Sequence, residues 1–287
     1  MLNIGIFESI YKSDQVVIND GFLPFVHKSN LEFSHWREFK IHTDMYSSKI
    51  HNNHDYCGLF SPKFSSKCKI KASQFIDFCI SNQDSDVFFI NPFPQLSYLS
   101  LNTWMHAEVF HSGITNVAIN LIDAAGIDLS IDKQARHGAD VLAYSSFWCG
   151  NQLFWEEYVG KVLLKLSKFI IKNPQNSAVK AALTETFHYD PNPYLPFITE
   201  RLFTTFISQN KFIKYKSYPL DPYQYCLNDF EISLVRNMES KIMKADQKKD
   251  FSSSLIDEMS KNCKFLAAHA QHYYKSNIHP HTGKLFT

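Results

Sequence analysis

Two aspartates, Asp84 and Asp86, are separated by one residue and come directly before the apolar run of residues 87–90. Two carboxylates at this spacing can ligate a hard cation such as Mg²⁺ or Mn²⁺, which then bridges the oxygens of a diphosphate. The same spacing also occurs by chance in loops that precede strands. If the run is a strand, the aspartates lie at its amino end, whereas ligands in open α/β sheets gather outside the carboxyl ends. The pair therefore fits either a metal site or a plain loop.

The carboxyl ends of the apolar runs carry a more coherent set of side chains. Lysine and hydroxyl donors suit a phosphate, and aromatic faces suit a base or a sugar ring. The residues at these ends are Glu8 after the first run, Ser61, Lys63 and Lys67 after the second, Asn91 and Pro92 after the third, and Ser146 and Asn151 after the fourth. A turn or a helix junction explains any one of them equally well. As a set, they predict a phosphate-binding lip at one edge of a sheet.

Short apolar runs bounded by polar residues predict the strands that would form this sheet, at residues 4–10, 56–60, 87–90 and 141–145. Such runs are typical of strands buried on both faces. Residues 71–82 and 113–126 lie between them and have helical patterns. Alternation of strands and helices favours an α/β fold with a mixed, mostly parallel sheet.

From Asn151 onward the pattern changes to long helices. Residues 151–172 repeat apolar side chains at helical spacing, and the next helix begins near Leu195. Two further helical patterns cover residues 229–247 and 252–275. We expect an α/β region over residues 1–150 and a helical cap over residues 151–287, joined in one continuous domain.

Charge and cysteine content exclude several classes of function. Lysine and arginine total 29 and aspartate and glutamate total 28, so the net charge of +1 gives no reason to expect nucleic acid as a partner. Six cysteines without a Cys-x-x-Cys pair suggest neither a zinc site nor a disulfide framework, which fits a reducing cytoplasm. No window approaches the roughly 18 apolar residues of a membrane span. Contact with a membrane would therefore be peripheral.

Six segments within the first 206 residues share patterns with a known family. They are HWREF (35–39), YCGLFSPKFSSK (56–67), DVFFINPFPQ (86–95), NTWMHAEVFHSG (102–113), YSSFWCGNQLFWEEYV (144–159) and PFITERLFTTF (196–206). Together they resemble bacterial glycosyltransferases encoded with surface-polysaccharide genes, broadly of the GT-A type. In that type an Asp-x-Asp element runs into a pattern such as DSDVFFINPF, although its apolar strand usually precedes the carboxylates.

The resemblance implies a GT-A-like, Rossmann-type fold and a specific reaction. A sugar would move from a nucleoside-diphosphate donor, most simply a UDP-hexose, to a growing O-antigen or capsule glycan in the cytoplasm, at the inner face of the membrane. Asp84 and Asp86 would hold Mn²⁺ or Mg²⁺. The alternative is a noncatalytic carbohydrate-binding or scaffold protein of the same assembly. A nucleotidyltransferase is a weaker alternative, because the chain has no Gly-rich phosphate loop.

Glycosyl transfer needs a base near the acceptor, for which Glu108, His111 and Glu200 are candidates. If Glu108 and His111 are helical, their spacing of three residues places them on one face, where they could act together or form a local capping pair. Glu200 falls at the edge of the apolar face of its helix and can reach a groove between cap and sheet. Arg201 points away from that face, toward solvent or an anionic ligand. Trp36 and Glu38 fit the wall of an acceptor or nucleotide site, and Trp36 alternatively fits the core.

Overall fold

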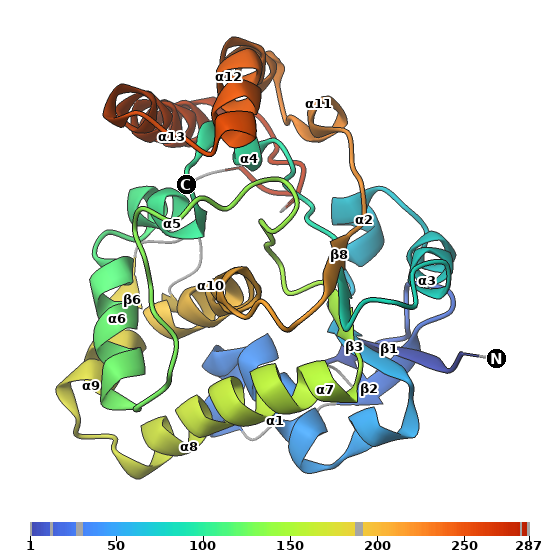
Figure 1. The fold of residues 1–287 in the computed structure, drawn as a ribbon. Helices are drawn as coiled ribbons and strands as arrows, with labels where there is room; N and C mark the ends of the chain where they lie inside the picture. Colours follow the sequence, from blue (N-terminus) through green and yellow to red (C-terminus); the bar gives the residue numbers. More distant parts are fainter. Residues whose placement is uncertain (1, 12–13, 27–30, 187–191, 282, 286–287) are drawn as a thin grey trace.

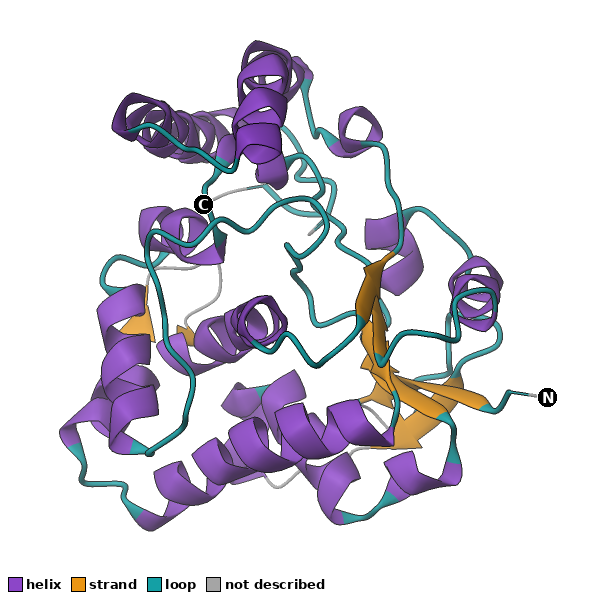
Figure 2. Cartoon of the chain, in the orientation of Figure 1, coloured by secondary structure: helices purple, strands orange, loops and turns teal. Residues whose placement is uncertain are grey.

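A computed structural model of the chain describes residues 2–11, 14–26, 31–186, 192–281 and 283–285. Its main sheet has six strands in the order β2-β1-β3-β5-β4-β8 and lies to the right in Figures 1 and 2, with helices on both of its sides. The strands are β1 (Ile4–Ile10), β2 (Leu23–Val26), β3 (Tyr56–Phe60), β4 (Val87–Phe89), β5 (Trp148–Gly150) and β8 (Tyr215–Ser217). A separate two-stranded sheet pairs β6 (Glu185–Thr186) with β7 (Asn192–Pro193).

The large sheet is mixed and mostly parallel, as the sequence predicts. β1 pairs in parallel with β2 and β3, and β4 pairs in parallel with β8. β5 lies between β3 and β4 and runs antiparallel to both. The carboxyl ends of β1, β3 and β4 therefore meet the start of β5 at one edge of the sheet. The last strand, β8, comes from the part of the sequence in which only helices were expected.

Alternating side chains of the central strands bury both faces of the sheet, because successive residues in a strand point to opposite sides. On one face Leu59, Phe89 and Trp148 pack against helices α1 (Glu38–Ser47) and α10 (Tyr194–Gln209). The other face packs Phe60, Phe88 and Cys149 against α2 (Phe64–Cys68) and α3 (Ala72–Ile80). Burial on both faces explains why the strands are continuous apolar runs in the sequence.

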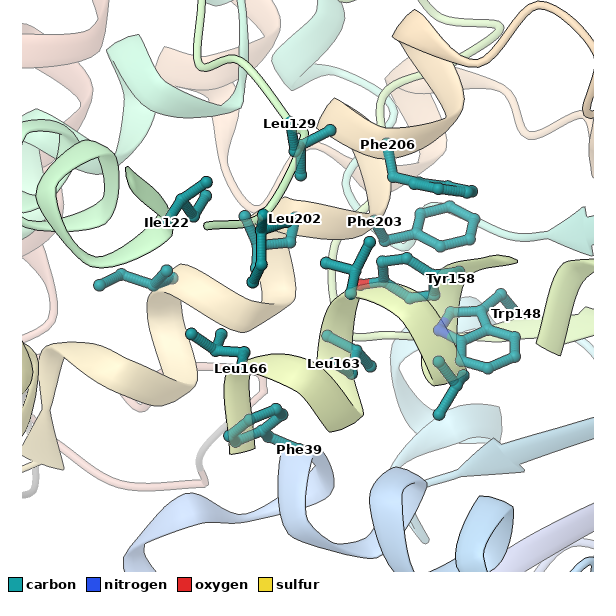
Figure 3. Close-up of a cluster of buried hydrophobic side chains, with 14 of the residues drawn as sticks. Phe39, Ile122, Leu129, Trp148, Tyr158, Leu163, Leu166, Leu202, Phe203 and Phe206 are labelled. Carbon is teal, nitrogen blue, oxygen red and sulfur yellow. The ribbon is translucent and has the colours of Figure 1, made fainter. Parts of the chain in front are cut away.

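One long helix crosses the larger core, with α-helical ends α7 (Gln152–Phe154) and α8 (Lys165–Lys172) and a π-helical middle, η3 (Trp155–Leu164). Its Leu163 and Leu166 meet Phe39 of α1 and Leu202 of α10 (Figure 3). The remaining helices of this region are η1 (Leu31–Trp36), η2 (Ile50–Asn53), α5 (Thr103–Phe110), α6 (Ile114–Ala124) and α9 (Ser177–Leu183).

The C-terminal helices form a third core away from the sheet. Helices α12 (Asp229–Lys248) and α13 (Ser253–Tyr273) lie beside α4 (Leu96–Leu99) at the top of Figure 1, and α11 (Pro222–Tyr225) leads to them. Their apolar faces bury Leu99, Leu142 and Met238 together. In the part of the chain that the structure describes, no helix is long and apolar enough to cross a membrane.

The strand predicted at residues 141–145 is wrong. The segment is buried, but it pairs with no strand, and the main-chain N–H of Ala143 donates to Oγ1 of Thr204 at 3.0 Å instead. Ser145 and Ser146 then turn the chain with φ values of 67° and 53°, and β5 begins only at Trp148. A side chain on α10 thus satisfies a backbone group that a neighbouring strand would otherwise satisfy.

Candidate functional site

A cavity of about 130 Å³ opens at the carboxyl edge of β3, between α1, α10 and the turn before β5. At about 30 Å³ of liquid volume per water, this cavity holds about four water molecules. Its polar lining consists of Arg37, Glu38, His42, Ser61, Lys67, Ser145, Ser146, Thr199 and Glu200. Its apolar lining consists of Trp36, Phe39, Trp148, Tyr158, Leu163, Pro196 and Phe197. We call this cavity the edge pocket.

The strand order explains why a cavity forms at this edge. From β1 the chain moves to β2 on one side and then returns to β3 on the other side of β1. Connections that leave a sheet in opposite directions open a crevice outside the carboxyl ends of the strands between them. Ser61 directly follows β3 and lines the edge pocket, so the pocket lies at the position where α/β sheets usually bind ligands.

Lys67 is the cation that α2 contributes to the pocket. Its Nζ donates a hydrogen bond to Oγ of Ser145 at 2.9 Å, and Nζ lies 5.8 Å from the centre of the Phe93 ring. Burial lowers the pKa of Lys67, while the carboxylates of Glu200 and Glu38 oppose that shift. The ammonium group therefore faces carboxylates across a partly desolvated pocket, where its charge acts strongly on a bound anion.

Glu200 of α10 lies in the pocket wall, at the groove expected from the sequence. Its Oε1 accepts a hydrogen bond from the main-chain N–H of Ser145 at 2.6 Å, and its Oε2 lies 3.3 Å from Nη1 of Arg201. The expectation that Arg201 faces solvent or a ligand is wrong, because its side chain is 4% exposed and does not line the pocket. Arg201 instead donates to the carbonyl oxygens of Phe197 and Thr103, which ties α10 to α5.

Backbone strain is concentrated at the pocket. Six described non-glycine residues have positive φ, and three of them, Arg37, Ser145 and Ser146, line the edge pocket. Each such conformation costs about 1–3 kcal/mol and persists only where the surroundings enforce it, which is common at ligand sites. Glu200 and Lys67 supply that enforcement for Ser145 through its main-chain N–H and its hydroxyl.

Four other residues predicted for the lip lie at the same edge but do not line the pocket. Glu8 is fully buried, and its carboxylate accepts hydrogen bonds from the main-chain N–H groups of Ile18 and Asn19 at 2.8 and 3.0 Å. Asn91 caps its own turn through the main-chain N–H of Phe93 at 3.0 Å. Lys63 is exposed and Pro92 is buried. Glu8 and Asn91 therefore hold the chain at this edge.

Asp84, Asp86 and Asn151 lie at the opposite edge of the sheet. Because β5 runs antiparallel, Asn151 at its end meets the amino end of β4, and its Nδ2 donates to Oδ1 of Asp86 at 2.9 Å. The other oxygen of Asp86 accepts from the main-chain N–H of Lys214 at 2.8 Å, while Asp84 is exposed. These aspartates do not fit a metal ion at the edge pocket. No group of three or more potential metal ligands occurs within the described ranges.

Of the two alternatives for Glu108 and His111, the structure shows local capping by Glu108. Glu108 accepts hydrogen bonds from the main-chain N–H groups of Gly113 and Thr115 at 2.8 and 2.9 Å, so it caps the start of α6. His111 lies just beyond the end of α5, and its ring stacks on Phe197 with centroids 3.9 Å apart. Neither residue lines the pocket, although His111 stacks on Phe197, which does.

The structure adds Arg37, His42 and Thr199 to the site, none of which the sequence indicated. Arg37 and His42 come from the start of α1, which has no pronounced apolar periodicity, and Thr199 looks like an ordinary helix residue. Trp36 is part of the core, since it is 2% exposed, and it also lines the wall of the pocket. These residues meet only when α1 packs against α10 and the long helix.

Comparisons of the chain with models of known protein families, with curated proteins and with solved structures found no match. The edge pocket and its chemistry are therefore the basis for a proposed function.

Proposed function

We propose that this protein is a glycosyltransferase of GT-A type that moves a sugar from a nucleoside-diphosphate donor, a UDP-hexose, to a growing bacterial surface glycan. The observation that carries the proposal is the edge pocket. It lies at the switch in strand order and combines the cations Lys67 and Arg37 with the carboxylates Glu38 and Glu200 over an aromatic floor. This combination suits a ligand that is part anion and part sugar.

Some lining residues act on the leaving diphosphate and others on the attacking hydroxyl. Lys67 and Arg37 stabilise the negative charge that develops on the leaving diphosphate, and the hydroxyl of Ser61 donates to it. A carboxylate accepts the proton of the attacking hydroxyl. Glu200 accepts from the main-chain N–H of Ser145 through one oxygen and from Arg201 through the other, so Glu200 positions the turn at Ser145. Glu38, which the Tyr11 hydroxyl hydrogen-bonds, is the better candidate for this base. Asp84 and Asp86 take no part in this reaction, because they lie at the opposite edge of the sheet.

A noncatalytic carbohydrate-binding protein is the second candidate. The aromatic lining of Trp36, Phe39 and Trp148 favours it, because apolar contact with a sugar needs no diphosphate. In that case Lys67 would pair only with Glu38 and Glu200, and a nucleotide would add nothing to the affinity.

Thermal unfolding with UDP and with UDP-glucose, each with and without Mn²⁺, tests the proposal. At a concentration of 100 times Kd, a ligand stabilises the folded chain by about 2.7 kcal/mol, which raises Tm by several degrees. Lys67→Met should weaken nucleotide binding by roughly 10- to 100-fold, because a charge-assisted hydrogen bond to phosphate is lost. Lys63→Met is the matched control, since Lys63 is exposed and lies outside the pocket.

A carbohydrate-binding protein would show stabilisation by sugars and none by UDP. Hydrolysis of the donor separates the enzyme classes, since release of UDP and free sugar supports glycosyl transfer, whereas release of UMP and sugar 1-phosphate contradicts it.

A further inference from the structure

The chain after α13 folds back on itself in a short turn. The main-chain N–H of His279 donates to the carbonyl of Lys284 at 2.9 Å, and the N–H of Gly283 donates to the carbonyl of His279 at 2.8 Å. The ring of His279 also contacts the buried ring of Tyr274, with centroids 4.5 Å apart, which attaches the turn to the end of α13. We call residues 276–281 and 283–285 the C-terminal turn.

The C-terminal turn places His281 beside the cationic side of the edge pocket. The rings of His281 and Phe93 have centroids 5.2 Å apart, and Nζ of Lys67 lies 5.8 Å from the centre of the same Phe93 ring. The ring of His281 and the ammonium of Lys67 are therefore no further apart than these two distances together. A diphosphate that accepts a hydrogen bond at each end can bridge such a gap. Because Lys67 lines the edge pocket, a ligand there can reach both groups.

The ring of His281 is accessible to a ligand. It is half-buried, and its nitrogens are not among the buried polar atoms that lack a partner. Within the described ranges neither ring nitrogen forms a hydrogen bond, since the group that donates to His279 Nδ1, at 3.2 Å, is the main-chain N–H of His281. Both ring nitrogens are therefore open to solvent and available to an anion.

The surroundings of His281 are basic. Every charged group that acts on its pKa is a lysine or a histidine, namely Lys67, His279, Lys69 and Lys63. Burial, and after it these positive charges, lower the pKa of His281 to about 4, so the ring is neutral at pH 7. The carboxylates Glu200 and Glu38 act on Lys67 from the pocket but not on His281. None of the three lysines forms an ion pair among the described residues, and uncompensated positive charge attracts an anion.

We infer that the C-terminal turn completes the anion-binding end of the edge pocket, where a diphosphate bound at Lys67 also contacts His281 and the ring takes up a proton from solvent. The identity of the ligand rests on the function proposed above. The negative charge of the diphosphate outweighs that of the lysines, and the protonated ring donates to a phosphate oxygen. In glycosyl transfer the same contact stabilises the leaving diphosphate. Lys63 and Lys69 are exposed, so water and salt screen their charges and neither is part of this contact.

Calorimetric titration of UDP-glucose into the wild type at pH 7.5 and pH 6.0 tests the inference, because the diphosphate of UDP-glucose neither gains nor loses a proton in this range. We expect binding to tighten by about fivefold from the higher to the lower pH, the gain for an average uptake of half a proton. Titrations at pH 6.0 in two buffers of different ionisation enthalpy measure the proton uptake directly.

Two variants of His281 and one control assign the proton. His281→Phe keeps an aromatic ring against Phe93 but takes up no proton, so its affinity for UDP-glucose should not rise as the pH falls. His281→Asn, which also does not titrate, should lose the pH dependence in the same way. His272→Phe is the matched control and should behave as the wild type, since His272 is exposed on the last turn of α13 and does not line the pocket.

Equal tightening in the wild type and in His281→Phe would overturn the inference and leave the proposed function intact, and so would a wild-type affinity that does not change with pH. If the wild type binds no UDP-glucose at either pH, the proposed function fails, and the anion site is tested alone with sulfate at constant ionic strength. For this, the pKa of His281 is followed by NMR through its Cε1 proton. A pKa that rises and saturates with sulfate supports the contact, and an unchanged pKa overturns it.

Discussion

At the scale of single residues, the buried carboxylate of Glu8 serves the main chain. Its two oxygens accept from the N–H groups of Ile18 and Asn19, one each. Asn19 in turn accepts a hydrogen bond from the main-chain N–H of Ser65, so the end of β1 and helix α2 are linked through one acidic side chain. The sequence predicts that Glu8 lies near the end of a strand, but it does not indicate the hydrogen-bond partner Ile18, which is 10 residues further on.

Glu8→Gln should lower the free energy of unfolding by about 2 kcal/mol, because one main-chain N–H then faces an amide NH₂ group and loses its acceptor. The midpoint of urea unfolding measures the change. Glu185→Gln, at an exposed residue, should stay within about 0.5 kcal/mol of the wild type. Equal stability of Glu8→Gln and the wild type would show that the carboxylate does not hold the loop.

At the scale of elements, the segment of residues 141–147 decides the shape of the edge pocket. It enters as a buried extended chain, turns at Ser145 and Ser146, and continues into the antiparallel strand β5. Thr204 of α10 both donates to the carbonyl of Ala143 and accepts from its N–H, at 3.2 and 3.0 Å. The helix that carries Glu200 thus also positions the turn that Glu200 binds.

Thr204→Val has nearly the same shape but removes both hydrogen bonds, so a buried N–H and a buried carbonyl lose their partner. We expect a loss of about 1–3 kcal/mol in the free energy of unfolding and weaker binding of UDP, because the turn is no longer held. Urea unfolding and calorimetry measure the two effects. Thr184→Val is the control, since Thr184 is exposed and far from the pocket lining. Loss of stability with unchanged UDP binding would mean that the turn is held without Thr204.

At the scale of the whole molecule, the buried His42 and His137 and the half-buried His106 couple the fold to pH. Burial lowers the pKa of His42 to about 4, of His106 to about 3 and of His137 to about 4, from an ordinary value of 6.5. Above pH 6.5 these rings are neutral in both states, so their burial costs no protonation energy. As the pH falls from 6.5 toward 4, the unfolded chain takes up protons that the folded chain does not, and stability is lost.

The free energy of unfolding should therefore fall between pH 7 and pH 5 by about 2 kcal/mol for each of these histidines. Urea unfolding at a series of pH values measures the slope. His106→Phe, which keeps an aromatic ring beside Phe110 and Tyr144, should reduce that slope by about one proton. A slope that is the same in the wild type and in His106→Phe would show that His106 titrates normally in the folded protein.

The sequence by itself determined the elements that local periodicity defines. Strands β1 and β3 have the predicted bounds, β4 ends one residue earlier than predicted, and the predicted helices correspond to α3, α6, the long helix, α10, α12 and α13. The rule that ligands gather at carboxyl ends also brought Ser61 and Lys67 to the pocket, because it depends only on strand direction in a parallel sheet. Ser146 lines the pocket for a different reason, since it precedes the antiparallel strand β5 and follows no strand.

Only the tertiary structure decided what depends on pairing between distant segments. The antiparallel direction of β5 moved Asn151 to the far edge, beside Asp86, because a three-residue strand has no local signal for its direction. Packing of α1 against α10 and the long helix brought Arg37 and His42 into the pocket and buried Arg201. Periodicity specifies which face of an element is apolar, whereas the depth of a side chain and its neighbours follow from how the elements pack.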